Sequence, residues 1–155
     1  MIKLSRLADY GVTLMTQLGN RSGMLVTAPD LALVTGLSVP TVSKVLKLLA
    51  QNELVASQRG TKGGYTLVRR AEDISVAEII RAVDGPIALT ECLEGENICD
   101  LEAICPTRTS WRRINDLVSD ALENIALTEM MSTDLPFVAP AARPRVGAPA
   151  PGAGD

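Results

Sequence analysis

Residues 27–68 hold the feature that most constrains the fold, because two helical patterns meet at a glycine and two short β-type runs follow them. Thr27 and Pro29 are typical of a helix start, Gly36 interrupts the apolar pattern, and Ser38 is placed to cap a second helix. The apolar side chains that this second helix would bury are Val42, Val45, Leu46 and Leu49. The spacing indicates a helix-turn-helix, although an ordinary helical hairpin would contain the same two helices.

The segment LVASQRGTKGGYTLV, residues 54–68, separates these two interpretations. Its two β-type runs surround three glycines, and Arg59 and Lys62 lie at the tip. A cationic hairpin directly after a helix-turn-helix is typical of a wing, which lays its backbone against phosphates and inserts an arginine into a minor groove. We therefore expect DNA contacts from the second helix and the wing. The predicted residues are Ser38, Pro40, Thr41, Ser43, Lys44, Arg59, Lys62, Gly63 and Gly64.

The charge distribution also assigns this role to the first half of the chain. Residues 1–73 carry nine Lys and Arg against five Asp and Glu, whereas residues 74–155 carry six against thirteen. The balances of +4 and −7 are hidden in a net charge of −3. A basic first half suits a polyanionic partner such as DNA, and the acidic second half must serve another purpose.

Further helical patterns lie on both sides of this unit. Residues 5–20 form an amphipathic pattern with Ser5 as its cap, and an S-x-x-E capping box of Ser75 and Glu78 begins a later helix. Residues 106–130 then carry an apolar stripe at helical spacing, made by Trp111, Ile114, Leu117, Val118, Leu122 and Ile125. Because so small a domain cannot cover this stripe, we expect the long helix to pair with a second copy.

These patterns predict a mostly α fold with a small β-hairpin, namely a winged helix-turn-helix with a long C-terminal dimerisation helix. Residues 1–73 would form the DNA-binding domain, and residues 74–132 would hold a metal-binding loop and the dimerisation helix. Residues 133–155 would form a disordered tail, since fourteen of the last twenty residues are Pro, Ala or Gly.

All three cysteines, Cys92, Cys99 and Cys105, lie in one acidic segment, ECLEGENICDLEAICPTR. In a reducing cytoplasm, clustered thiols are typically metal ligands or redox groups rather than disulfides. Soft thiolates select zinc, copper(I) or iron–sulfur clusters, and the x6 and x5 spacings differ from the paired knuckles of structural zinc sites. The spacing fits a larger group such as an iron–sulfur cluster, with zinc and metal-free thiol redox sensing left open as alternatives. Cys105 also precedes the last helical pattern, where the helix dipole favours a thiolate.

Other classes of protein have less support in the sequence. The N-terminus lacks the features of a secretory signal, and no run of eighteen apolar residues occurs, so we expect a cytoplasmic protein with no membrane partner. The chain has no histidine, no phosphate-binding glycine loop and no nucleophile–base arrangement. We therefore expect no enzyme and no small-molecule substrate; a small iron–sulfur electron carrier is the alternative from a different class.

The order of these motifs resembles the Rrf2 family of bacterial transcription regulators over residues 1–132. The opening MIKLSRLADYGV, the wing RGTKGGYTL and the phrase GPIALTEC are most similar to the branch that regulates the SUF system of iron–sulfur cluster assembly. The resemblance implies a homodimer that binds a pseudo-palindromic operator in double-stranded DNA. It also implies a [2Fe-2S] or [4Fe-4S] cluster whose occupancy changes DNA affinity. A nitric-oxide-sensing or redox-sensing regulator of the same family is the alternative.

The fourth cluster ligand departs from the family pattern. The branch that regulates the housekeeping assembly system has a histidine shortly after the third cysteine, where this chain has Arg108. The nitric-oxide-sensing branch resembles this chain in an aspartate near the start of its first helix, here Asp9, which comes from the partner subunit. The resemblance thus implies that the metal ligands are Cys92, Cys99, Cys105 and Asp9. Alternatively, Asp9 interacts only with the dipole of its own helix, and nearer acids ligate instead. Those acids are Glu91, Glu94, Glu96, Asp100 and Glu102.

Overall fold

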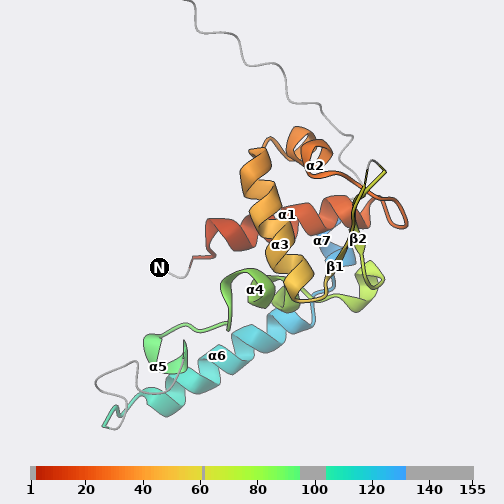
Figure 1. Ribbon diagram of the computed structural model, residues 1–155. Coiled ribbons are helices and arrows are strands. Elements are labelled where there is room, and N and C mark those ends of the chain that lie inside the picture. Colours follow the sequence, from red (N-terminus) through yellow and green to blue (C-terminus); the bar gives the residue numbers. More distant parts are fainter. Residues whose placement is uncertain (1–2, 61, 95–103, 132–155) are drawn as a thin grey trace, which may run out of the picture.

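The computed structural model describes residues 3–60, 62–94 and 104–131 (Figure 1). Its elements are, in chain order, α1 (Arg6–Gly19), α2 (Ala28–Thr35), α3 (Val39–Gln51), β1 (Val55–Gln58), β2 (Gly64–Leu67), the 3-10 helix η1 (Ala71–Asp73), α4 (Val76–Asp84), α5 (Glu91–Glu94), α6 (Arg108–Glu123) and α7 (Leu127–Met130). The predicted fold class, mostly α with one β-hairpin, is confirmed. The predicted tail, residues 133–155, lies outside the described residues.

Short polar side chains begin the helices at the predicted positions. Ser5, Thr27 and Ser38 each accept a hydrogen bond from the backbone amide three residues later. Ser75 and Glu78 form the complete capping box before α4. Each cap satisfies an amide that has no partner within its helix, so the sequence defines these helix starts locally.

The turn between α2 and α3 depends on Gly36. This residue ends α2 with a φ of 72°, in the left-handed region that glycine adopts without steric cost, and its amide donates to the Ala32 carbonyl over 2.9 Å. The two helices bend by 116° across the turn, which makes the helix-turn-helix. Taken singly, no helix in the described ranges is long and apolar enough to cross a membrane; α2 and α3 meet those criteria only as this bent pair.

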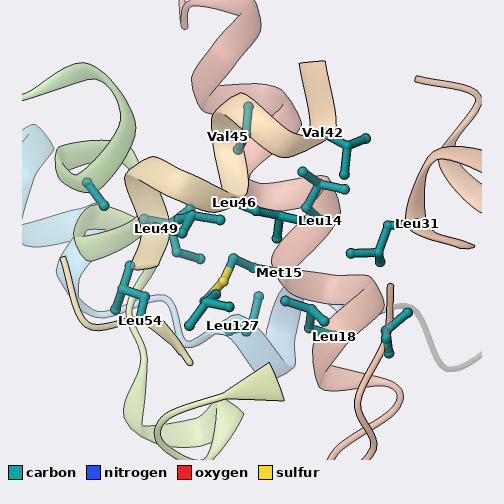
Figure 2. Close-up of a cluster of buried hydrophobic side chains, with 14 of the residues drawn as sticks. Leu14, Met15, Leu18, Leu31, Val42, Val45, Leu46, Leu49, Leu54 and Leu127 are labelled. Carbon is teal, nitrogen blue, oxygen red and sulfur yellow. The ribbon is translucent and has the colours of Figure 1, made fainter. Parts of the chain in front are cut away.

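One apolar core joins the helix-turn-helix to elements from the end of the chain. Figure 2 shows Leu127 of α7 among side chains of α1 and α3. The largest fully buried members include Leu14, Met15, Leu31, Val42, Val45, Leu46, Leu49, Ile79 and Leu127. Burial of such a side chain contributes about 1.5–3 kcal/mol. Packing therefore continues past residue 73, and the division into domains stays a prediction about the roles of the segments.

The wing is attached to the rest of the fold by a third stretch of backbone. β1 and β2 are antiparallel, with Val55 opposite Leu67 and Gln58 opposite Gly64. Val26, between α1 and α2, exchanges two backbone hydrogen bonds of 3.0 and 2.8 Å with Tyr65 of β2. These bonds hold the hairpin against the helix-turn-helix and give the wing a defined orientation.

The last helical pattern does not form the single helix that the sequence predicts. Between α6 and α7, Ala126 pairs with Ser75 in an antiparallel bridge: the Val76 amide donates to the Ile125 carbonyl over 2.9 Å, and the Leu127 amide donates to Ile74 over 2.8 Å. Leu127 then enters the core with no exposed surface. The prediction of a continuous helix is wrong here, because distant backbone pairing and burial of Leu127 outweigh the local pattern.

The apolar stripe of α6 divides into a covered part and an exposed part. Leu122 and Ile125 pack on a second buried cluster that Ala8 and Ile80 help to form. Trp111, Ile114 and Leu117 remain 40%, 43% and 62% exposed. The expectation that the chain leaves the whole stripe uncovered is therefore wrong for Leu122 and Ile125.

Candidate DNA-binding surface and thiol site

The predicted DNA-contacting residues of α3 lie on the side of the helix away from the core. Ser38, Pro40, Ser43 and Lys44 are exposed, and Thr41 is half-buried. The Ser38 and Thr41 hydroxyls are 2.8 Å apart, and Ser38 also caps the helix, so these two side chains already have partners within the chain.

Lys47 extends the same surface, and the predicted site does not include it. It is exposed and lies three residues after Lys44, a spacing that places two residues on one face of a helix. Neither lysine forms an ion pair with a residue that the structure describes. Their spacing was the signal that could have identified Lys47 from the sequence.

Arg59 and Lys62 lie at the wing tip, and both are exposed. Neither side chain has a hydrogen bond or an ion pair to any residue within the described ranges, so both charges are available to phosphates. The arginines behind the wing differ: Arg69 pairs with Glu78 over 2.5 Å, and Arg70 pairs with Glu72.

The two wing glycines of the predicted site, Gly63 and Gly64, have different roles in the structure. A Cβ on Gly63 would lie 2.2 Å from the Gln58 carbonyl oxygen, so the tight turn at the tip requires glycine. Gly64 is buried, and a Cβ there would lie 3.0 Å from the Val26 backbone. Gly64 thus lies where the hairpin meets Val26, while Gly63 belongs to the tip.

The described thiols lie on the two chain segments that meet the first half of α6. Cys92, in α5, is buried, and its Sγ is 3.3 Å from Thr90 Oγ1. Cys105 precedes α6 and is half-buried, with its Sγ 3.4 Å from Thr107 Oγ1. Hydrogen bonds from the Thr107 hydroxyl and amide lower the pKa of Cys105 below its ordinary value, which favours the thiolate. Both cysteines are free thiols; Cys99 lies outside the described residues.

The predicted fourth ligand, Asp9, is exposed in the first turn of α1. Its position also suits the alternative interaction with the helix dipole. Among the described residues, no three Cys, Asp or Glu side chains come together as a metal site. The described part of one chain therefore does not assemble the four predicted ligands. Glu91 and Glu94 are exposed beside Cys92, and the other three acids of the segment lie outside the described residues.

The C-terminal end of α6 is fixed to α4 by polar contacts. Glu123 accepts hydrogen bonds from the Arg81 guanidinium and from the Ser75 hydroxyl, the latter over 2.9 Å. These bonds lower the pKa of Glu123. α6 thus extends from the core of the helix-turn-helix to the segments that carry the thiols (Figure 1).

A shallow apolar groove of about 180 Å³ lies beside α6. Leu4, the end of α4 and the segment after it form one side, and Val118 and Leu122 of α6 form the other. The groove and the exposed part of the stripe therefore share one helix.

Sequence comparisons place the chain among regulators. The family model Rrf2, described as an iron-dependent transcriptional regulator, matches residues 4–133. The HTH-type transcriptional regulator IscR of Pectobacterium atrosepticum is 35% identical over 133 residues, which are 84% of this chain and 80% of the relative. IscR of Vibrio parahaemolyticus is 34% identical over 132 residues, with 84% and 78% covered.

Solved structures agree in fold. CymR, the global cysteine regulator of B. subtilis, matches with a TM-score of 0.67 and 29% identity over 84% of this chain and 97% of that chain. T. potens IscR matches with a TM-score of 0.65 and 31% identity over 84% and 86%. The curated relatives are transcriptional regulators rather than enzymes. As its motif order predicts, this chain belongs to the Rrf2 family of DNA-binding, winged-helix transcriptional regulators.

Proposed function

We propose that the protein is a homodimeric regulator that senses iron–sulfur cluster status and controls genes of iron–sulfur assembly, as in the SUF system. The observation that carries this proposal is the position of Cys92 and Cys105. Both thiols lie on segments that adjoin α6, whose other end is fixed to the core of the DNA-binding unit. A change at the thiols would thus act on a helix whose C-terminal end is bonded to that core.

The donor chemistry of the described residues fits such a cluster. Thiolates are the usual ligands of iron–sulfur clusters, and the Thr107 hydrogen bonds favour the thiolate of Cys105. Cys92, Cys99 and Cys105 would hold the cluster together with Asp9 of the partner subunit. A bound cluster would supply a redox-active, oxygen-sensitive group, in either the [2Fe-2S] or the [4Fe-4S] form. Asp9 would then link the DNA-binding half of one chain to the thiols of the other.

A second copy of this chain would cover the exposed part of α6. Trp111, Ile114 and Leu117 offer an apolar ridge, and the groove beside Val118 and Leu122 offers a complementary hollow. Ridge and groove lie on one helix, so a two-fold axis that sets one ridge against the partner's groove also sets the partner's ridge against the first groove. Burial of this ridge removes apolar surface from water and so favours the dimer.

The dimer would present two copies of the DNA-binding surface. Each α3 would enter a major groove, with Lys44 and Lys47 directed toward the DNA, while Arg59 and Lys62 of the wing approach a minor groove and phosphates. Two-fold symmetry requires a pseudo-palindromic operator, with half-sites about 34 Å or a multiple of that apart. Such a regulator would act in the cytoplasm, where bacterial DNA is located.

The test is to purify the protein without air and to count iron and sulfide per chain. Operator binding is then measured with the cluster present and after its removal. We expect a visible chromophore, stoichiometric iron and sulfide, and a change in operator affinity when the cluster is lost. The affinity changes only as far as the cluster binds the two conformations of the dimer differently. Protein without iron, or equal affinities, would contradict the proposal.

A metal-free thiol sensor is the second candidate, and the hydrogen-bonded thiol of Cys105 favours it. A thiolate that is not fully buried is the form that oxidants attack. In that case iron-free protein would still change its operator affinity on treatment with peroxide, and Cys105→Ser would abolish the response. The cluster proposal predicts no such response in iron-free protein.

A further inference from the structure

The Asn115 side chain of α6 binds the backbone of the segment that leads to Cys92. Its Oδ1 accepts a hydrogen bond from the Leu89 amide, and its Nδ2 donates one to the Ile87 carbonyl, both over 3.0 Å. Only one orientation of the amide satisfies both bonds, because the donor and the acceptor occupy fixed sides of the group. The half-buried Asn115 therefore holds the segment in one register against α6, much as a neighbouring strand would.

Cys92 lies three residues after Leu89, the end of this attachment. Leu89 is the last residue held by Asn115, and the Thr90 carbonyl then accepts the Leu93 amide over 2.9 Å as α5 begins. The Thr90 hydroxyl also contacts Cys92 Sγ at 3.3 Å. The position of the thiol relative to α6 therefore depends on where Leu89 is held.

The same helix leads back to Cys105. α6 begins at Arg108, so Asn115 lies about two helical turns from its start, and Cys105 lies three residues before that start. α6 thus connects Asn115, which holds the segment before Cys92, with the segment at the start of α6 that carries Cys105. A cluster needs its thiolates at set distances, and the two Asn115 bonds restrict one of those distances.

We propose that Asn115 is a positioning residue for the thiol site, holding Cys92 in place relative to α6 and Cys105. Its effect on a cluster rests on the proposed function, but its effect on Cys92 does not. Cys92 is buried, so an alkylating reagent reaches it only when the segment opens locally. Removal of the two bonds should raise the population of the open form, and the alkylation rate reports that population in metal-free protein.

The first experiment measures iodoacetamide labelling of each cysteine in metal-free, reduced protein by peptide mass spectrometry. Asn115→Ala should raise the labelling rate of Cys92 about tenfold, since two backbone bonds are lost, and should leave Cys105 unchanged. Asn115→Asp should also raise it, because its second carboxylate oxygen would face the Ile87 carbonyl. Thermal unfolding followed by circular dichroism identifies any variant that fails to fold.

Asn124→Ala is the matched control. Asn124 ends the same helix, but its side chain donates to the Asp120 carbonyl of its own helix, over 2.7 Å. This variant should label Cys92 at the wild-type rate. An unchanged Cys92 rate in both Asn115 variants, or an equal rise in the Asn124 control, would overturn the inference.

The second experiment uses protein that holds its cluster. Asn115→Ala should alter the visible circular dichroism spectrum of the cluster and lose iron faster in air than wild type, while Asn124→Ala matches wild type. If wild-type protein binds no iron but Asn115→Ala still exposes Cys92, the proposed function fails and the attachment of Cys92 stands. If Cys92 becomes more reactive but the spectrum and the rate of iron loss stay those of wild type, Asn115 does not position a ligand.

Discussion

The two ends of α6 are held in different ways, and this difference separates the DNA-binding unit from the thiol region. At its C-terminal end, α6 leads through a backbone bridge into Leu127, which the core buries completely. At its N-terminal half, the Asn115 bonds hold the segment before Cys92, and Trp111 and Leu117 remain exposed. The first region is complete within one chain. The second leaves apolar side chains exposed and carries the free thiols of Cys92 and Cys105.

The largest expected effect concerns the exposed ridge. Glu at both Ile114 and Leu117 would place charges in the proposed apolar interface. We therefore expect the dissociation constant of the dimer to rise by a factor of about 1,000 or more. Sedimentation would then show monomers with an unchanged far-UV spectrum. Thr109→Glu, on another face of α6, is the control and should remain a dimer. Leu122 is a poorer position for this test because it packs within its own chain. If the double variant is still a dimer, the dimer interface does not include this part of α6.

Helix α7, which follows α6 and carries the buried Leu127, gives the next largest effect. Leu127→Ala removes a fully buried side chain from the core, and we expect a loss of about 2–5 kcal/mol in the free energy of unfolding. Met130 of the same helix is 45% exposed, so Met130→Ala should cost far less. Chemical denaturation measures both. Equal losses in the two variants would mean that α7 is not part of the core.

The wing should affect operator binding more than stability. If Arg59 enters a narrow minor groove, Arg59→Ala should weaken operator binding by about 1–3 kcal/mol. Lys62→Ala should weaken binding to operator and random DNA alike and reduce the salt dependence, as expected for a phosphate contact. Arg70→Ala serves as a control, since Arg70 pairs with Glu72 behind the wing. Fluorescence anisotropy at several salt concentrations measures the DNA affinity of all three variants. Unchanged affinity in the Arg59 and Lys62 variants would show that the wing does not contact DNA.

The smallest effect is a dependence of stability on pH at the C-terminal end of α6. Hydrogen bonds from Arg81 and Ser75 lower the pKa of Glu123 in the folded state, so its ionised form favours folding. The contribution is complete above the ordinary Glu pKa and is lost as the pH falls through the lowered folded-state value. The pair is largely solvated, so we expect Glu123→Gln to cost less than about 1 kcal/mol at neutral pH. The variant should lose less stability than wild type between neutral and acid pH. An identical pH profile would exclude this contribution.

Local rules predicted the parts of the fold that local contacts determine. The Ser5, Thr27 and Ser38 caps act over three residues, and the Gly36 turn and the hairpin are equally local. The break after Glu123 was not predictable, because its cause is pairing of Ala126 with Ser75, far away in the sequence.

The candidate sites also divide into parts set by local sequence patterns and parts set by contacts between distant residues. The exposed faces of α3 and the wing follow from helical and hairpin periodicity, and the lysines and arginine on them are exposed in the structure. The attachment by Asn115 joins residues that are 26 and 28 positions apart, so no local pattern indicates it. The ligand roles of Cys92, Cys99, Cys105 and Asp9 remain predictions, as do the DNA contacts.

The most direct test of the central claim, that the thiols form one cluster site that controls DNA binding, is a comparison of three variants purified without air. Cys92→Ala, Cys99→Ala and Cys105→Ala are each measured for iron and sulfide content and for operator affinity. Loss of one thiolate leaves iron open to water and oxygen, so each variant should lose most of its iron and bind the operator as the cluster-free wild type does. Full iron and sulfide in each variant, with a wild-type response to air, would contradict a shared site and leave three independent thiols.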